Sequence, residues 1–295
     1  MQATTATHTP VMVEEVLQWL NVRPEGTYVD ATAGLGGHTA AIARRLTTGW
    51  VVANDCDAES LEIARRNTLL WAERIRFRRG WFSTLAEGLT QLGLRQVDGL
   101  LADLGASYAQ LTGERGFSIM TEGPLDMRFD RSSELTAADL VNTLSQPDLA
   151  RLISQQGEEP ERRSAAIARA IVRARPIRST AQLARVIEAV APRTGRLHPA
   201  TRTFMALRRV VNREDQELEA LLAAAPKLVA PGGRVVVISF MSLEDRKVKR
   251  AFQQWERAGQ AVRLLKHVLR PQPEEVRRNP AARSARLRAV EIART

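Results

Sequence analysis

Gly34, Gly36 and Gly37 form a glycine-rich turn directly after a short β-favouring stretch that ends in Asp30. Glycine lets the backbone adopt positive φ angles and lets a ligand lie close to it. We expect a helix to begin at His38, where N–H groups at the start of the helix can bind polar ligand groups. The turn therefore predicts the first half of a nucleotide-type cofactor site.

Three carboxylates, Asp30, Asp55 and Asp103, fall where predicted strands end. In parallel α/β sheets these ends share one edge, and ligands bind there. Asp55 suits the ribose hydroxyls of either a nicotinamide cofactor or S-adenosylmethionine. The dinucleotide fingerprint would need its third glycine where Thr39 stands. Asp103 and the tight turn after it are typical of sites that methylate amino groups. These residues favour S-adenosylmethionine and leave a dehydrogenase open.

The elements that position these residues alternate between strand and helix from residue 27 to residue 103. This alternation predicts right-handed βαβ units and a parallel sheet with helices on both faces. The expected strands are 27–30, 50–54, 75–79 and 97–102, and the expected helices are 38–46, 58–70 and 83–92.

The alternation stops in the middle of the chain. A loop-rich stretch covers 107–135, and helices without a convincing strand are expected at 136–144, 147–156, 161–175 and 180–191. The parallel pattern then resumes, with helices at 203–229 and 243–257 and strands at Arg234–Ser239, 261–268 and 285–292. We expect a doubly wound Rossmann-like α/β domain at 1–105 and 207–295, interrupted by an all-helical insertion at 106–206. An RNA cleft is expected between the two.

The chain carries a net charge of +10, and residues 160–213 contribute 13 arginines against two acidic side chains. Arginine suits phosphate contacts, so nucleic acid is the leading partner, with solvated helix faces as the alternative. A single cysteine, Cys56, argues against a disulfide framework and a cysteine-based zinc cluster, and no metal is expected. Residues 1–9 lack a secretory pattern, and no apolar run suits a membrane helix. A cytoplasmic protein is expected.

Several sequence blocks in one order extend the motif along nearly the whole chain. They are His8–Met12, Tyr28–His38, Asp103–Gly105, Gln110–Leu111, Arg115–Ser118, Gly123–Arg128, Gly157–Glu159, His198–Phe204, Val211–Asn212, Ser239–Arg246, Asn279–Pro280 and Ala282–Ser284. With these blocks the chain resembles the bacterial ribosomal small-subunit RNA methyltransferase H family. That family methylates the exocyclic N4 of a decoding-centre cytidine in 16S rRNA.

The resemblance implies a binding site for the methyl donor. Its residues are Gly36, Gly37, His38, Asp55, Phe82, Asp103 and Gln110. The two glycines would admit the methionine end, Asp55 would accept from the ribose, and Phe82 would cover the adenine. Asp103 and Gln110 would bind polar groups of the donor or the incoming amine. Asp103 is therefore the expected catalytic residue.

Three positions depart from the family pattern: Tyr108 follows Ser107 in place of a second serine, Met205 replaces glutamine, and Met241 replaces histidine. The last change argues against a histidine base there. The target base must leave its surroundings to reach the donor, which requires a pocket with planar walls. Tyr108, Phe117 and Arg202 are the candidates for that pocket.

Transfer to an exocyclic amine needs alignment and an acceptor, whereas methylation of cytosine carbon 5 needs a nucleophilic cysteine. Cys56 follows the ribose-binding Asp55 and is badly placed for such an attack. His198 could simply order the loop before Pro199, and Glu244–Arg246 could be a helix start. The rival functions are a DNA amino-methyltransferase and an RNA-binding assembly factor without turnover. The oligomeric state is open, a homodimer included.

Overall fold

The computed structural model describes residues 10–193 and 197–294. Its chain divides into two compact units, which we call the sheet unit (Met1–Gly105 with Gln216–Thr295) and the helical unit (Ala106–Asp215). The expected boundary at 206/207 lies inside a helix of the helical unit. Among the described residues, no helix is long and apolar enough to span a membrane. The expectation for residues 1–9, with His8 and Thr9 of the first block, lies outside the described residues.

The sheet unit is built on one seven-stranded sheet with the order β3-β2-β1-β4-β5-β7-β6. Its strands are β1 (Thr27–Asp30), β2 (Trp50–Asp55), β3 (Ile75–Arg79), β4 (Val97–Asp103), β5 (Val229–Ser239), β6 (Ala261–Arg263) and β7 (Arg286–Ile292). The first five strands pair in parallel. The strand order reverses direction at β1 and β4, so ligands are expected at the carboxyl ends of these two strands.

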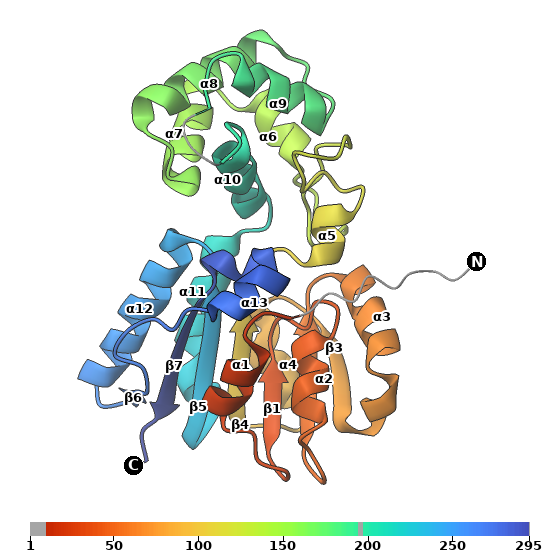
Figure 1. Ribbon diagram of the computed structural model, residues 1–295, viewed down its shortest axis with the longest axis vertical. Helices are drawn as coiled ribbons and strands as arrows, with labels where there is room; N and C mark the ends of the chain where they lie inside the picture. Colours follow the sequence, from red (N-terminus) through yellow and green to blue (C-terminus); the bar gives the residue numbers. More distant parts are fainter. Residues whose placement is uncertain (1–9, 194–196, 295) are drawn as a thin grey trace. The chain divides into compact units, whose positions relative to one another are not determined.

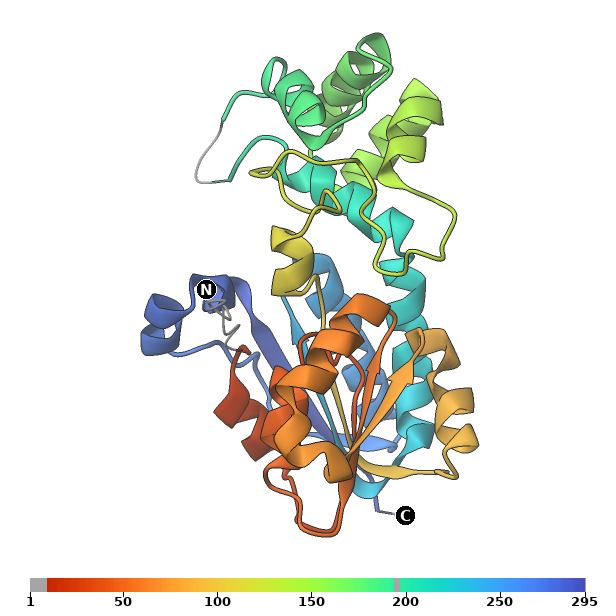
Figure 2. The same cartoon turned by 90° about the vertical axis from the view of Figure 1, so that its right-hand side faces the viewer.

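Helices cover both faces of this sheet, as Figures 1 and 2 show. The helices of this unit are α1 (Val13–Leu20), α2 (Gly37–Ala43), α3 (Ala58–Asn67), α4 (Leu85–Gln91), α11 (Glu214–Leu228), α12 (Ser242–Arg257) and α13 (Pro273–Arg278), the last of which buries none of its residues. Three short 3₁₀ helices, η1 (Leu69–Arg74), η2 (Phe82–Thr84) and η3 (Pro280–Ser284), complete the unit. The first two residues of α11 belong to the helical unit.

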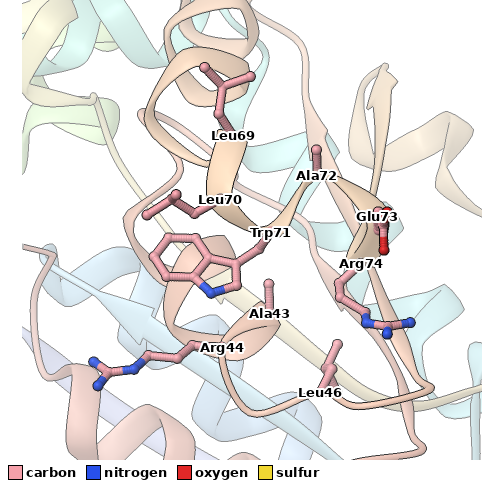
Figure 3. Close-up of a pocket in the computed structure, with 9 residues that line it drawn as sticks. All are labelled: Ala43, Arg44, Leu46, Leu69, Leu70, Trp71, Ala72, Glu73 and Arg74. Atoms are coloured by element: carbon pink, nitrogen blue, oxygen red, sulfur yellow. The ribbon is translucent and has the colours of Figure 1, made fainter.

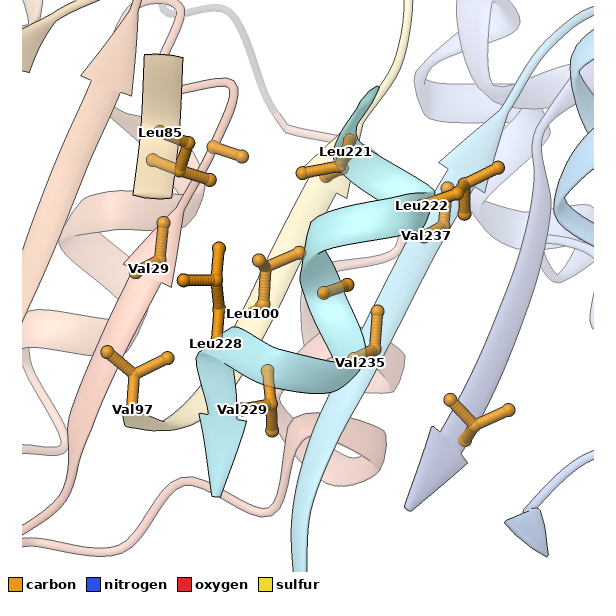
Figure 4. Packing of buried hydrophobic residues seen from close by; sticks show 14 of the residues in the cluster. Val29, Leu85, Val97, Leu100, Leu221, Leu222, Leu228, Val229, Val235 and Val237 are labelled. Carbon is orange, nitrogen blue, oxygen red and sulfur yellow. The ribbon is translucent and has the colours of Figure 1, made fainter. Parts of the chain in front are cut away.

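The valine-rich strands have a hydrophobic core on each side. On one face, leucines of α4 and α11 pack against Val29, Leu100 and Val235 (Figure 4). On the other face, α1, α2 and α3 pack against the same strands through residues such as Leu17 and Ile42. Strands buried on both faces explain the near-continuous apolar runs in the sequence.

The described part of the helical unit contains six helices, and the last five of them supply the helical residues of its own core. The six helices are α5 (Tyr108–Thr112), α6 (Ala137–Thr143), α7 (Gln146–Gly157), α8 (Glu161–Arg173), α9 (Thr180–Glu188) and α10 (Thr201–Val211). Serine or threonine side chains cap the N-termini of α5, α6, α7 and α9. Such caps satisfy N–H groups that a helix cannot pair internally.

The long loop between α5 and α6 is held by its own polar residues. The Arg115 guanidinium donates to the carbonyl of Phe129 at 3.1 Å, and the ring of Phe117 stacks on Phe129 with centroids 5.5 Å apart. Asn212 accepts from the Phe129 N–H at 2.6 Å and donates to the Met127 carbonyl at 2.7 Å. Several of the family-like blocks therefore build a loop scaffold.

The four early strands are confirmed, and three expectations for the later part are wrong. The expected helix 203–229 is two helices, α10 and α11, because Arg213 adopts a positive φ of 49° and the Asn212 side chain bonds to the loop. The expected strand 261–268 ends at Arg263. The last strand, β7, inserts between β5 and β6 and is antiparallel to both. Helices α1, α5 and α13 were not expected.

Candidate functional site

The turn after β1 needs its glycines for two different reasons. Gly34 and Gly36 have φ angles of 51° and 87°, which side chains rarely tolerate. Gly37 is needed for packing, because a Cβ there would lie 2.8 Å from Cγ of Pro10. Gly36 precedes the first residue of α2. The turn therefore brings bare backbone to the carboxyl edge of the sheet.

Asp30 at the end of β1 braces this turn from inside. Its side chain is fully buried, and it accepts hydrogen bonds from the Thr39 hydroxyl at 2.6 Å and from the Thr32 N–H at 3.2 Å. Burial raises the pKa of its carboxyl, against the effects of His38 and Thr39. Asp30 thus joins the strand to the first turn of α2, and sequence reasoning had missed both threonines.

Asp55 ends β2 and lies next to the turn. Its carboxylate accepts from the Gly34 N–H at 2.8 Å and from the Asp57 N–H at 2.9 Å. Burial raises its pKa to about 6, although these two hydrogen bonds oppose the shift. A carboxylate oxygen accepts more than one hydrogen bond, so Asp55 keeps acceptor capacity for hydroxyl donors.

Asn54, which sequence reasoning missed, holds the ends of three strands together. Its buried amide donates to the carbonyls of Ala31 at 3.1 Å and Gly80 at 3.0 Å, and its oxygen accepts from the Arg78 guanidinium. The only sequence signal was a polar residue within an otherwise apolar strand.

Asp103 ends β4 and faces the first turn of α2. Its N–H donates to the Thr32 hydroxyl at 2.7 Å, and its Oδ2 lies 3.4 Å from Nε2 of His38. The atoms Oδ1 of Asp103 and Nδ1 of His38 are buried without a hydrogen-bond partner among the described residues. Buried polar atoms of this kind mark places where a ligand or water completes the bonding.

His38 is a buried imidazole in an acidic setting. Burial is the largest single influence and lowers its pKa, whereas the adjacent Asp103 carboxylate raises it. Asp30 and Glu275 add to the same effect, and the net pKa lies above the usual value. Glu275 on α13 also accepts from the Met12 N–H at 2.7 Å. Glu275 is thus a carboxylate at this edge that comes from far along the sequence, and no local motif predicted it.

Phe82 is the first residue of η2, after β3. Its ring is partly buried and packs against the core shared by α4 and α11. The ring therefore offers one apolar surface from a fixed position.

Gln110 and Tyr108 lie on α5 in the helical unit. Gln110 is buried, and its Oε1 accepts from the Ser107 N–H at 2.8 Å while Ser107 Oγ accepts from the Gln110 N–H at 3.3 Å. This reciprocal pair is a capping box, so Gln110 has a structural task at the start of α5. Tyr108 begins the helix with 44% of its surface exposed.

Phe117 and Arg202 also belong to the helical unit but have different surroundings. Phe117 is only 8% exposed and belongs to the core, with one face on Phe129. Arg202 is the second residue of α10, donates to the Glu158 carbonyl at 3.1 Å, and lies 3.8 Å from the buried carboxylate of Glu159. Of the three substrate candidates, Tyr108 and Arg202 are the accessible ones.

Two further motif residues have structural partners. Nδ1 of His198 accepts from the Ala200 N–H at 3.1 Å, and Nε2 lies 2.8 Å from Glu188. Glu244 accepts from the N–H groups of Phe240 and Met241, which fixes the start of α12.

A surface pocket of about 440 Å³ lies at the C-terminal end of α2, away from the glycine turn. Figure 3 shows Trp71 beside Leu70 and Ala43, with Arg44 and Arg74 nearby. None of the predicted site residues lines it.

The sheet order, the glycine turn and the carboxylates at the strand ends define a Rossmann-like domain with a nucleotide-type cofactor site. The model of the MraW methylase family matches residues 5–293, and the chain belongs to this family. It is a methyltransferase, and its methyl donor is S-adenosylmethionine.

Two relatives match along the whole chain. The ribosomal RNA small subunit methyltransferase H of Solibacter usitatus is 58% identical over 286 residues, which cover 97% of this chain and 99% of that protein. The protein of the same name from Acidobacterium capsulatum is 50% identical, over 96% of this chain and 98% of its own length. A solved SAM-dependent O-methyltransferase of Thermotoga maritima has a TM-score of 0.46 and 11% identity over 99% of this chain and 69% of its own, a likeness too distant to bear on the site.

The residues at the sheet edge fit the methyl donor. Asp55 retains acceptor capacity for ribose hydroxyls, and the buried Oδ1 of Asp103 requires a donor. S-adenosylmethionine supplies both hydroxyl and ammonium donors, and an incoming amine supplies another.

Proposed function

We propose that this protein methylates the exocyclic N4 of a decoding-centre cytidine in 16S rRNA, within the small ribosomal subunit. The observation that carries the proposal is the end-to-end identity of 58% and 50% to two proteins named ribosomal RNA small subunit methyltransferase H. A protein that methylates ribosomal subunits must meet them where they lie, so we also propose that this protein is cytoplasmic.

In this proposal Asp103 is the catalytic residue. When bound, the donor would supply an electrophilic methyl group on a sulfonium, and a neutral thioether would be the leaving group. Asp103 accepts a hydrogen bond from the target amino group through its partly exposed carboxylate, and this directs the nitrogen lone pair towards the methyl carbon. The amine proton is then held at the same carboxylate. Positioning of this kind accounts for much of the barrier reduction in such displacements.

The donor in this proposal is held by Gly36, Gly37, His38, Asp55, Phe82 and Gln110, as well as by Asp103. Asp55 accepts from the ribose, and Phe82 lies against the adenine. The imidazole of His38, whose Nε2 lies 3.4 Å from Oδ2 of Asp103, holds that carboxylate in place.

The helical unit is the proposed RNA-recognition part. Its residues 160–213 contain the 13 arginines, which suit phosphate recognition. Tyr108 and Arg202 are accessible enough to contact the extruded base, whereas the core position of Phe117 supports an indirect role in shaping that pocket.

Cys56 supports N4 over ring carbon 5 as the target. It follows Asp55, and its carbonyl accepts from the Arg79 guanidinium at 3.4 Å. A carbon-5 mechanism needs a cysteine that attacks the base, whereas N4 transfer does not.

The test uses labelled S-adenosylmethionine and small ribosomal subunits from cells that lack this activity. After incubation, the RNA is digested and its nucleosides are identified by mass spectrometry. N4-methylcytidine in 16S rRNA is the expected product. Another methylated nucleoside would overturn the N4 assignment. Donor binding without incorporation would favour DNA as the substrate, and absence of donor binding would favour an assembly factor without turnover.

A further inference from the structure

Of the 13 arginines of residues 160–213, 12 lie in the described residues, and two groups among these differ in their surroundings. Five pair with carboxylates or donate to carbonyl oxygens inside the helical unit: Arg163, Arg175, Arg202, Arg208 and Arg209. Arg175, for example, donates to the Val141 carbonyl at 2.7 Å, and Arg208 forms a bidentate pair with Glu214 at 2.7 and 2.8 Å. These five arginines stabilise the helical unit. Fewer arginines are therefore available to bind a partner than the net charge of the segment suggests. Arg196 lies outside the described residues.

Three others, Arg162, Arg169 and Arg173, are exposed on α8. Their spacing of seven and four residues places them in one row along the helix. The buried residues of α8 follow the opposite face: Ser164, Ile167, Ala168 and Ile171. The row is therefore turned away from the unit's core, and at 1.5 Å per residue it extends for about 16 Å. We call these three residues the α8 arginine row.

The members of the α8 arginine row are not paired with acidic side chains in the part of the chain that the structure describes. Arg162 stands in the first turn of α8, where the helix dipole disfavours a cation. Arg169 and Arg173 are like charges four residues apart, which also destabilises a helix. Helix stability therefore does not explain the row, and an anionic partner does.

We propose that the α8 arginine row binds the sugar-phosphate backbone of the RNA substrate. This inference rests on the proposed function and adds which surface holds the RNA. A row of about 16 Å is too long for a single phosphate and suits successive phosphates of one strand. Each guanidinium can form bidentate hydrogen bonds with phosphate oxygens. The contacts give affinity and register without reading the base sequence.

The test variant replaces all three arginines (Arg162→Gln, Arg169→Gln, Arg173→Gln). The control (Lys249→Gln, Arg250→Gln, Arg257→Gln) removes three exposed cations from α12. Binding to a labelled single-stranded oligouridine is measured across a salt series. We expect the test variant to lower the slope of log K against log salt by about two to three and the affinity by about 10-fold or more, with the control close to wild type.

Two further measurements separate binding from folding. Because the row is unpaired and self-repelling, the test variant should keep its thermal stability or gain slightly, and its donor affinity should be unchanged. A matching Arg→Lys triple variant should retain the salt slope, since the slope counts charges. With small subunits as the substrate, KM should rise in the Gln variant while kcat is kept.

Different outcomes would overturn different statements. An unchanged slope in the Gln variant, or an equal loss in the α12 control, would contradict the inference. An unchanged slope with a raised KM for subunits would indicate a protein partner for the row in place of RNA. If wild-type protein bound donor but neither bound RNA nor methylated subunits, the proposed function itself would fail.

Discussion

The carboxyl edge of the sheet and the helical unit both contain polar residues from the family-like blocks, but they use them differently. At the sheet edge, Oδ1 of Asp103 and both ring nitrogens of His38 are buried without a hydrogen-bond partner in the described chain. In the helical unit, Arg115 and Asn212 have their bonds satisfied by loop carbonyls and N–H groups. Since unsatisfied buried groups are costly, they indicate ligand chemistry, whereas satisfied ones indicate scaffold.

Glu159 tests this distinction within the helical unit. Its Oε1 is buried and lacks a hydrogen bond in the described part of the chain, but it lies 3.5 Å from Arg163 and 3.8 Å from Arg202. Two guanidinium groups thus compensate its charge and join α8 to α10. Glu159 is therefore a buried carboxylate that joins two helices through its two cationic neighbours. Asp103 differs, because its side chain is partly exposed and has a single imidazole as its neighbour.

The largest effect is expected for Asp103→Ala. Loss of the acceptor should lower kcat by about 10²- to 10⁴-fold, the usual contribution of a positioned general base. The fold should persist, because the Asp103 N–H still donates to Thr32. Single-turnover methylation of small subunits measures the rate, and thermal unfolding checks the fold.

A matched control lies on the same strand. Asp98 is the second residue of β4 and accepts from the Thr27 N–H at 2.8 Å, at the opposite end from the site. Asp98→Ala should keep kcat. Near-normal turnover in Asp103→Ala would remove its catalytic assignment.

Asp55→Asn should lower the affinity for the methyl donor by about 10- to 100-fold, because a hydrogen bond to a charged acceptor contributes about 1.5–3 kcal/mol. The wild-type affinity should also depend on pH. Burial raises the Asp55 pKa to about 6, so the carboxylate is ionised above that pH and protonated below it. Donor affinity should therefore fall as the pH drops through about 6, as isothermal titration calorimetry can measure.

The neighbouring acid provides the comparison. Asp57→Asn removes the same charge from a residue that caps α3 by accepting from the Glu59 N–H at 3.0 Å. Asparagine is an equally good cap, so donor affinity at neutral pH should stay as in the wild type. The charge of Asp57 helps to raise the pKa of Asp55, so the midpoint of the pH dependence should move to lower pH in this variant. A pH dependence that persists in Asp55→Asn would assign it to another group.

The helical unit should respond to Asn212→Ala with lost stability and intact donor binding. The Asn212 side chain bonds to Phe129, Met127 and Arg208, and its removal leaves buried backbone groups unpaired. We expect a cost of about 2 kcal/mol or more in the free energy of unfolding. Denaturant unfolding measures it, with Asn67→Ala, an exposed residue with one bond to Leu35, as the control. Equal costs in the two variants would contradict the scaffold assignment.

The same contrast explains what the sequence could predict. The strands 27–30, 50–54, 75–79 and 97–102 were predicted because glycine turns and apolar runs are local signals. The break between α10 and α11 was missed because apolar periodicity continues across Asn212, whose bonds to a distant loop end the helix. The direction of β7 was missed for a related reason, since strand direction depends on neighbours that a local pattern does not specify.

The candidate site divides in the same way. Asp55 and Asp103 could be predicted because they end strands, and parallel strands bring their carboxyl ends together. Thr32 and Asn54 were missed because their importance depends on hydrogen bonds to particular backbone groups, which a sequence pattern does not show. Glu275 could not be predicted at all, because α13 was not expected and its contact with Met12 spans most of the chain.

The smallest effect is expected for His198→Ala. The imidazole accepts from the Ala200 N–H at 3.1 Å and pairs with Glu188 at 2.8 Å, both within the helical unit. Glu188 is about half exposed, so the pair contributes little, and we expect a loss of about 0.5–1 kcal/mol in the free energy of unfolding. If His198 orders this loop, Glu188→Gln should cost part of the same amount, and kcat for small subunits should stay within about twofold in both variants. A large fall in kcat for His198→Ala with unchanged stability would instead place the imidazole in contact with the substrate. His198 would then have a role in the chemistry, like the residues at the sheet edge, and would not be a scaffold residue.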